Sequence, residues 1–353
     1  MQKKQLILHI GYPKTGTTAI QNFLLHNSGE LLNSGYYYPK TGIATNAHHQ
    51  FPWSMTNDPR LKNKIDPKVL IRSLKNELKQ VNCSTVLMSS EGFIFAINPK
   101  YLRDYLSDLF DPITIIIYLR EPLSWIESDY NQAVKGHRAV TEDFNSFFGN
   151  HARKPKNSPI NYFETISSWA KVFNWGNLRV RSYHKNIDIF EDLLNTIEIK
   201  NQASYARSST ESNPRLPFKL LELARYINQA KTPFNTKTKM MSDLEKILPT
   251  EAITYNKPLL NGTNKAFANS CLMSSKKLVH HLKYEEDIQE LTHCLNTTNP
   301  ADFIKHQIDS SLLSLEAYAY LRHLYIYTQL PRAESMKEIE ALLPGDTKPT
   351  VMR

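Results

Sequence analysis

Cysteine is scarce in this chain, with only three in 353 residues. The three are odd in number and form no C-x-x-C pair, so we expect neither a disulfide framework nor a zinc site, and a reducing compartment. No apolar run is long enough to cross a membrane. The chain passes from Met-Gln-Lys-Lys straight into an apolar stretch, which predicts no secretory leader. We therefore expect a cytoplasmic protein without a transmembrane segment, and peripheral association with a membrane is compatible with this.

Blocks of one charge sign, internal repeats and low-complexity segments are also absent. The chain has 43 Lys and Arg against 34 Asp and Glu, for a net charge of +9, but these residues are scattered. Such an excess favours an anionic partner, either a nucleotide or a polysaccharide, and by itself leaves nucleic acid open. With 41% hydrophobic and 22% charged residues, the composition is that of a folded globular protein and excludes a disordered chain.

One stretch near the N-terminus combines a strand, a glycine turn and a helix start. Residues 6–10 form an apolar run of strand length, and apolar positions fall at helical spacing from Thr17 to Leu25. The turn between them runs from Gly11 to Gly16. A helix N-terminus that faces a glycine loop offers unpaired N–H groups and the positive end of the helix dipole. This arrangement suits a phosphate or phosphosulfate group.

The position of the lysine distinguishes this loop from a Walker A loop, in which lysine follows the second glycine. Here Gly11 and Gly16 keep the Walker spacing, but Thr17 stands in the lysine position and Lys14 lies inside the loop. The run P-K-T-G-T-T resembles the 5′-phosphosulfate loop of sulfotransferases that use 3′-phosphoadenylyl sulfate (PAPS). In this loop the resemblance assigns cofactor binding to Tyr12, Pro13, Lys14, Thr15, Gly16, Thr17 and Thr18. A strand-turn-helix with an incidental lysine is the alternative.

A second motif begins where the most apolar strand ends. Residues 113–119 are continuously apolar and rich in β-branched side chains, as in a strand covered on both faces. Arg120 follows, and Pro122 begins a helix that carries Ser128 about two turns further on. The pattern L-R-x-P-x-x-x-x-x-S-x-Y resembles the second signature of the same family, in which Arg and Ser hold the 3′-phosphate of PAPS. A guanidinium can fork onto phosphate oxygens, and a hydroxyl adds a donor.

Three residues are candidates for the base that an acceptor hydroxyl needs. His48 and His49 lie in a polar loop over about residues 40–67, and Glu91 follows the predicted strand 84–88. Ligands bind at the carboxyl ends of parallel strands. A histidine titrates near neutral pH, whereas a glutamate needs a raised pKa or a polarised hydrogen bond. We rank His48 and His49 together above Glu91, which could instead orient a histidine, bind a sugar hydroxyl or cap a helix.

The resemblance covers about the first 200 residues and is greatest to bacterial enzymes that act on carbohydrates. These share K-T-G-T-T-x-I-Q, a His-rich loop, S-S-E and S-x-Y-x-Q. It implies a three-layer, P-loop-type α/β fold around a mostly parallel sheet. It also implies sulfuryl transfer from PAPS to a carbohydrate hydroxyl, on a surface polysaccharide or glycolipid, with adenosine 3′,5′-bisphosphate as product. Lys14 would reach the oxygen that bridges phosphate and sulfate, and no metal or nucleic-acid partner is implied.

The domain organisation is less sharply defined by the sequence. We expect residues 1–200 to form the PAPS-binding core and residues 201–353 to form a mainly helical part packed on it. Helical spacing recurs near 215–230, 239–248, 274–296 and 311–328.

Two other functions stay open, namely a P-loop kinase of a small metabolite and a non-catalytic module that binds anionic glycans. The acceptor and the oligomeric state are not encoded in any recognisable pattern.

Overall fold

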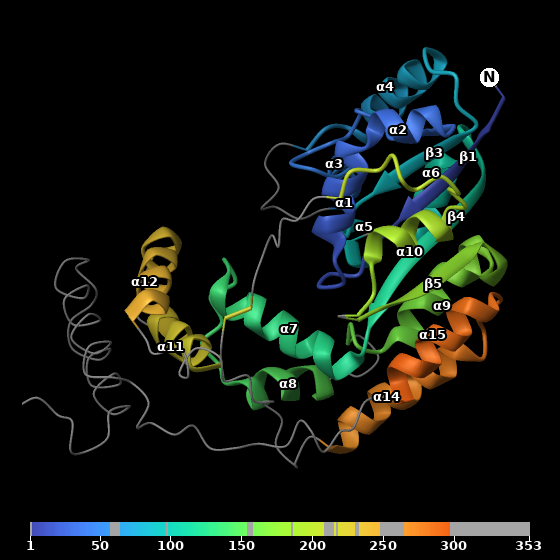
Figure 1. Cartoon of the computed structure of the whole chain (residues 1–353). Coiled ribbons are helices and arrows are strands. Elements are labelled where there is room, and N and C mark those ends of the chain that lie inside the picture. The colour runs from blue at the N-terminus through green and yellow to red at the C-terminus, as the bar shows by residue number, and fades with distance from the viewer. Residues whose placement is uncertain are drawn as a thin grey trace, which may run out of the picture. The chain divides into compact units, whose positions relative to one another are not determined.

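The computed structural model describes residues 2–56, 64–96, 98–153, 158–184, 186–207, 215–216, 218–229, 233–247 and 265–296 (Figure 1). The chain divides into two compact units. The first comprises residues 1–125, 159–213 and 270–298, and the second comprises residues 126–158, 214–269 and 299–353. Helix α15 (Glu285–Asn296), although far along the chain, therefore belongs to the same unit as the N-terminal strands.

A five-stranded, all-parallel sheet forms the centre of the first unit, in the order β2-β3-β1-β4-β5 (Figure 1). The strands are β1 (Lys4–His9), β2 (Tyr36–Tyr37), β3 (Thr85–Ser89), β4 (Phe110–Arg120) and β5 (Leu178–Tyr183). Leu8 in β1 aligns with Met88 in β3 and Ile115 in β4. The predicted α/β class with a parallel central sheet is confirmed. Because β1 is the middle strand, the loop that follows it emerges between the ends of β3 and β4.

Both faces of the sheet are buried, as the predicted layered fold requires. On one face, α1 (Thr17–His26), α2 (Ser28–Asn33) and α10 (Ile189–Thr196) share a hydrophobic core with Ile7 and Ile116. Leu6, Leu8, Ile115 and Ile117 alternate with these strand residues, point to the opposite face and are fully buried. Helix α9 (Tyr162–Phe173) contributes nothing to that core and contacts β4 and α6 (Pro99–Leu106).

Two sequence expectations in the first unit need correction. The segment 40–67 is not a continuous loop, because α3 (Gln50–Ser54) forms within it, ahead of α4 (Pro67–Lys79). The helix expected over 274–296 is two helices, α14 (Lys265–Val279) and α15. Lysines occupy the last turn of α14 and three acidic residues the first turn of α15, and each set complements its own helix dipole. This charge change marks the break that apolar spacing alone conceals.

The regular elements in the described part of the second unit are all helices. They are the portion of α7 (Pro122–Lys135) from Ile126 onward, α8 (Phe144–Arg153), α11 (Phe218–Gln229), α12 (Phe234–Ile247) and the start of α14. Lys237 of α12 is buried, and its Nζ donates to the carbonyl oxygens of Val134 at 3.0 Å and Gly136 at 3.2 Å. The C-terminal end of α7 is thus capped by a lysine from another helix.

The helix expected near 311–328 lies outside the described residues. In the part of the chain that the structure describes, no helix has the length and apolar character needed to cross a bilayer.

Candidate functional site

The glycine loop lies at the carboxyl edge of the sheet, between β1 and α1, in the strand-turn-helix context that the sequence predicts. Three of its residues have left-handed backbone angles, namely Gly11 (φ 71°), Lys14 (φ 69°) and Gly16 (φ 77°). Gly16 is also the N-cap of α1, and no side chain caps the helix there. A left-handed lysine is uncommon and persists only where the surroundings hold it. The left-handed conformation of Lys14 therefore indicates that the surrounding structure holds the loop in a fixed shape.

Hydrogen bonds and aromatic packing hold this loop in shape. The Thr15 hydroxyl donates to the carbonyl of Tyr12 at 2.6 Å, and Trp125 Nε1 donates to the carbonyl of Pro13 at 2.5 Å. Tyr12 has no exposed surface, and its hydroxyl donates to the Pro159 carbonyl. Its ring packs edge-on against Phe95, Trp125 and Tyr162. The side chain of Tyr12 is therefore an anchor for the loop.

Close neighbours on both sides explain why the two loop positions are glycine. A Cβ added to Gly11 would lie 2.6 Å from Cα of Glu91. A Cβ added to Gly16 would lie 2.6 Å from Ile189 Cδ1 and 2.9 Å from Tyr183 Cε2. The loop is thus held between Glu91 at the end of β3 and Tyr183 at the end of β5.

Arg120 ends β4 at the same edge of the sheet and is partly exposed. It aligns with Tyr183 of β5, and its Cζ lies 6.0 Å from the centre of the Tyr183 ring. Tyr183 therefore borders both Gly16 and Arg120, the two features that the sequence motifs assign to two different phosphates. Sequence reasoning missed Tyr183, although its place at the end of an alternating strand, at the edge where ligands bind, was a usable signal.

The residues after Arg120 begin α7. Glu121 is buried, and its carboxylate accepts hydrogen bonds from the backbone N–H groups of Leu123 at 2.7 Å and Ser124 at 2.6 Å. Burial raises the pKa of this carboxyl, and the two hydrogen bonds oppose that effect. Glu121 therefore caps the helix that Pro122 starts. Ser128, the predicted partner of Arg120, is buried in the part of α7 that belongs to the second unit, and its phosphate-binding role stays a prediction.

His48 is fixed by hydrogen bonds on both ring nitrogens. Its Nε2 lies 2.9 Å from the Pro39 carbonyl oxygen, and the backbone N–H of Ser89 donates to its Nδ1 at 3.2 Å. The ring must therefore be neutral, with its proton on Nε2. Complete burial lowers the pKa of His48 to about 4. The backbone N–H of His48 also donates to the Ser89 carbonyl at 2.8 Å, so this residue pins its loop to the end of β3.

His49 is presented differently. Its Nδ1 lies 2.7 Å from the Ser90 hydroxyl, and its ring stacks on Trp53 with centroids 5.4 Å apart and an interplanar angle of 19°. Its Nε2 has no hydrogen-bond partner among the described residues. Desolvation lowers the pKa of His49, and the nearby Glu91 carboxylate opposes this. Only one of the two adjacent histidines thus keeps a ring nitrogen available for a proton.

Glu91 lies beside the loop and is held by α1. The side-chain amide of Gln21, which is buried on α1, donates to Glu91 Oε2 at 2.5 Å. The backbone of Glu91 lies against Gly11, and its carboxylate acts to raise the pKa of His49, so Glu91 is close to both the glycine loop and the histidine. The structure therefore gathers the glycine loop, Glu91 and His49 at one edge.

A third histidine, His9, lies under this edge and was not singled out in the sequence. It ends β1 and is buried, with Nδ1 2.7 Å from the Ser89 hydroxyl. Its Nε2 is buried and has no hydrogen-bond partner among the described residues. Desolvation lowers the pKa of His9 to about 3, so the ring is neutral at neutral pH.

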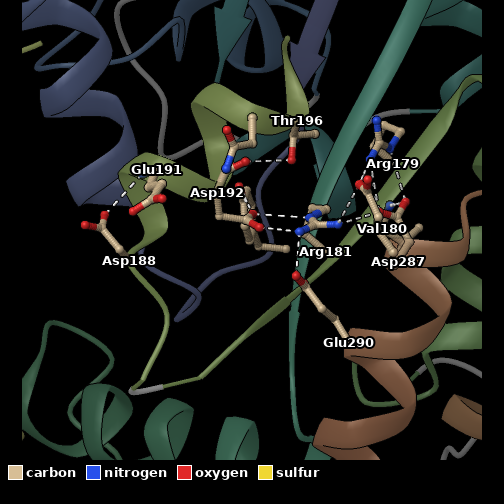
Figure 2. A network of polar contacts seen from close by, with 12 residues as sticks. Arg179, Val180, Arg181, Asp188, Glu191, Asp192, Thr196, Asp287 and Glu290 are labelled. Atoms are coloured by element: carbon tan, nitrogen blue, oxygen red, sulfur yellow. Dashed lines mark hydrogen bonds and ion pairs between the residues drawn. The ribbon is translucent and has the colours of Figure 1, made fainter. Parts of the chain in front are cut away.

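A buried ionic network fixes the wall behind Gly16. Figure 2 shows Arg181 of β5 between Asp192 of α10 and two acidic residues of α15. Its guanidinium donates to Asp287 at 2.8 Å and to Glu290 at 2.7 Å. Asp192 also accepts a hydrogen bond from the Tyr118 hydroxyl at 2.6 Å. Helix α10 begins at Ile189, which packs against Gly16. The network therefore fixes the helix next to the glycine loop to strand β5 of the sheet.

Comparison with known proteins finds similar solved structures but no matching family model and no matching curated protein. One is a sulfotransferase from Alicyclobacillus acidocaldarius, with a TM-score of 0.40 and 13% identity over 69% of this chain and 96% of that one. Another is mouse sulfotransferase SULT7A1 complexed with PAP, with a TM-score of 0.32 and 11% identity over 96% of this chain and 88% of that one. At such values the similarity carries no argument about activity.

Proposed function

We propose that this chain is a sulfotransferase that moves a sulfuryl group from PAPS to a carbohydrate hydroxyl and releases adenosine 3′,5′-bisphosphate. The observation that supports it best is the edge of the sheet where two adjacent parallel strands end. The glycine loop with its internal Lys14 follows β1, and Arg120 ends β4. A nucleotide with phosphate groups at both ends requires two such anion-binding positions.

In this proposal each feature has one task. The loop amides and the N-terminus of α1 bind the 5′-phosphosulfate, together with Thr17 and Thr18. Arg120 binds the 3′-phosphate, and Tyr183 borders the nucleotide between Gly16 and Arg120. A role for Ser128 at the same phosphate is what the sequence motif predicts. As the bond from sulfur to the bridging oxygen breaks, Lys14 stabilises the negative charge that grows on that oxygen. Positioning and charge stabilisation carry the reaction, by analogy with phosphoryl transfer.

The acceptor oxygen forms the new bond to sulfur and gives up its proton to a base. His49 fits this role, because its Nε2 has no partner among the described residues and its ring is only partly buried. Glu91 is the second candidate, since its backbone lies against Gly11 of the loop and its carboxylate acts on the pKa of His49. His48 would have to break a hydrogen bond to accept a proton, so we assign it to holding the loop. Trp53, stacked on His49, offers an aromatic face suited to a sugar ring.

A comparison of melting temperatures with PAPS, adenosine 3′,5′-bisphosphate and ATP plus Mg²⁺ tests the cofactor. A nucleotide at a hundred times its Kd stabilises a protein by about 2.7 kcal/mol. PAPS and the bisphosphate should raise the melting temperature, whereas a response to ATP alone would favour a metabolite kinase. Binding of an anionic polysaccharide without any nucleotide response would favour a glycan-binding module.

Transfer of radiolabelled sulfate from PAPS to bacterial polysaccharide tests the reaction. Lys14→Ala and Arg120→Ala should abolish labelling while the far-ultraviolet circular dichroism stays unchanged. Lys3→Ala and Arg72→Ala remove exposed cations elsewhere and serve as matched controls that should keep the labelling. Near-normal transfer by Lys14→Ala would refute the mechanism.

A further inference from the structure

A cavity between the first turn of α9 and the C-terminal half of α14 has no task in the proposed transfer. Both segments belong to the first unit. The cavity has a volume of about 490 Å³, within the range of small-molecule sites. Its lining includes Phe163, Glu164, Ser270, Met273, Lys276 and Lys277. It is therefore large enough for a single sugar or a group of similar size.

Side-chain contacts hold the two walls of this cavity together. The Ser274 hydroxyl of α14 donates to Asn161 Oδ1 at 2.5 Å and accepts the backbone N–H of Phe163 at 3.3 Å. Lys277 Nζ lies 4.1 Å from the centre of the Phe163 ring, a distance typical of a cation–π contact. The Phe163 ring also lies 5.0 Å from that of His281. The cavity is thus a feature of two helices that are joined to each other.

Positive charge collects at this cavity without being neutralised. Lys276 and Lys277 are exposed, and neither forms an ion pair among the described residues. The two arginines of β5, in contrast, are both paired with carboxylates of α15. Glu164 is the acidic residue among those that line the cavity in the described part of the chain. Two ammonium groups against one carboxylate favour an anionic ligand.

The other lining groups indicate which anionic ligand fits. The Glu164 carboxylate can accept a hydrogen bond from a sugar hydroxyl, whereas it repels a chain of phosphodiesters. Lys277 covers one face of the Phe163 ring, so that face is closed to a stacking nucleobase. Lysines that face the same space can donate charge-assisted hydrogen bonds to a carboxylate or a sulfate. This mixture suits a ligand that carries both hydroxyls and an acidic group.

We propose that this cavity binds an acidic sugar unit, a uronate or a sulfated sugar, within a polysaccharide chain. Its acidic group lies at Lys276 and Lys277, and its hydroxyls lie at Glu164. The first turn of α9 also contacts the proposed active site, because the Tyr162 hydroxyl donates to the Arg120 carbonyl at 2.8 Å. The inference rests on the proposed function in one respect, namely that this chain is the acceptor. The acceptor is then an acidic polysaccharide, held by a unit other than the one that reacts.

Calorimetric titration of the full chain without PAPS tests the binding. The probes are a hexasaccharide of galacturonate, a heparin hexasaccharide, neutral maltohexaose and a twelve-nucleotide oligo(dT). At least one acidic hexasaccharide should bind, and the Lys276→Ala/Lys277→Ala double variant should weaken it by about 10-fold. Maltohexaose or oligo(dT) binding as tightly as the acidic sugars would overturn the inference, as would no binding of either acidic hexasaccharide.

A matched double variant separates a site from general attraction to a basic protein. Lys75→Ala/Lys79→Ala removes the same charge from exposed positions on α4 and should keep the affinity within twofold. An equal loss of affinity in the two double variants would show that net charge alone attracts the sugar. The cavity would then have no binding role.

Methionine methyl signals locate the ligand directly. Met273 lines the cavity and is 64% exposed, whereas Met88 is buried in β3. In protein labelled with carbon-13 at the methionine methyl groups, the Met273 signal is identified by its loss in Met273→Leu. Saturation with the bound acidic hexasaccharide should shift the Met273 signal and leave that of Met88 in place. An unmoved Met273 signal at saturation would refute the assignment to this cavity.

Transfer assays distinguish this inference from the proposed function. With an acidic polysaccharide as acceptor, Lys276→Ala/Lys277→Ala should raise the KM for the polysaccharide by about 10-fold and leave the KM for PAPS unchanged. An unchanged KM for the polysaccharide would contradict the role of the cavity in holding the acceptor. If the parent binds the acidic hexasaccharide at Met273 but transfers no sulfate from PAPS, the proposed function fails while the binding site stands.

Discussion

Two buried neutral histidines should make this protein unusually sensitive to mild acid. The pKa of His9 is lowered to about 3 and that of His48 to about 4, in both cases chiefly by desolvation. In the unfolded chain both side chains return to the reference value of 6.5. Between these values the unfolded state binds more protons than the folded state, so stability is lost as pH falls below about 6.5. Above that pH, neither histidine contributes a pH dependence.

The size of the loss in the free energy of unfolding follows from the lowered pKa values of His9 and His48. At pH 5, linkage assigns about 2 kcal/mol of destabilisation to each histidine relative to pH 8. Together they amount to about 4 kcal/mol, a large part of the roughly 5–15 kcal/mol that stabilises a typical domain. Both rings contact Ser89, so the two effects need not add. Single variants therefore give the cleaner measurement.

Urea denaturation of His9→Leu and His48→Gln at pH 8 and pH 5 measures the effect. Each variant is compared with its own free energy of unfolding at pH 8, and the relevant quantity is the further loss on going to pH 5. We expect that loss to be about 2 kcal/mol smaller than in the parent. His26→Gln, at an exposed histidine, should lose as much as the parent does. An unchanged loss in both buried-site variants would refute the assignment of the acid sensitivity to these two rings.

Three further substitutions have defined outcomes. Gly16→Ala should lose PAPS-induced thermal stabilisation, because its Cβ meets Ile189 at a φ of +77°, whereas Gly29→Ala, with nothing within 4 Å, should keep it. Asp287→Ala should lower the free energy of unfolding, measured by urea denaturation, by about 3 kcal/mol, because the buried charge of Arg181 loses one of its carboxylate partners. Glu285→Ala, at an exposed position of the same helix, should change it little. Lys237→Met should lower the melting temperature, because two carbonyls at the end of α7 lose their donor.

The elements that position the site could be predicted because their signals are local. Residues 113–119 are apolar and β-branched throughout, and they form most of β4. The glycine spacing and the helical pattern after it predict β1, the loop and α1. The break between α14 and α15 was missed, because apolar residues continue across it and only the charges change. The Arg181 network was missed as well, since its partners come from separate helices.

The contrast between His48 and His49 shows where sequence reasoning ends. The two residues are adjacent and identical, so composition, spacing and motif treat them alike. Their difference comes from β3, more than 30 residues later. The backbone N–H of Ser89 donates to the His48 ring, whereas it is the side-chain hydroxyl of Ser90 that contacts the His49 ring. The two serines present different groups because successive residues at a strand end point in opposite directions. One histidine is thereby used to fix the loop, and this same fixation holds the other beside Glu91 and the glycine loop. His48 is thus bonded at both ring nitrogens and His49 at one, and which of them is the base stays a prediction.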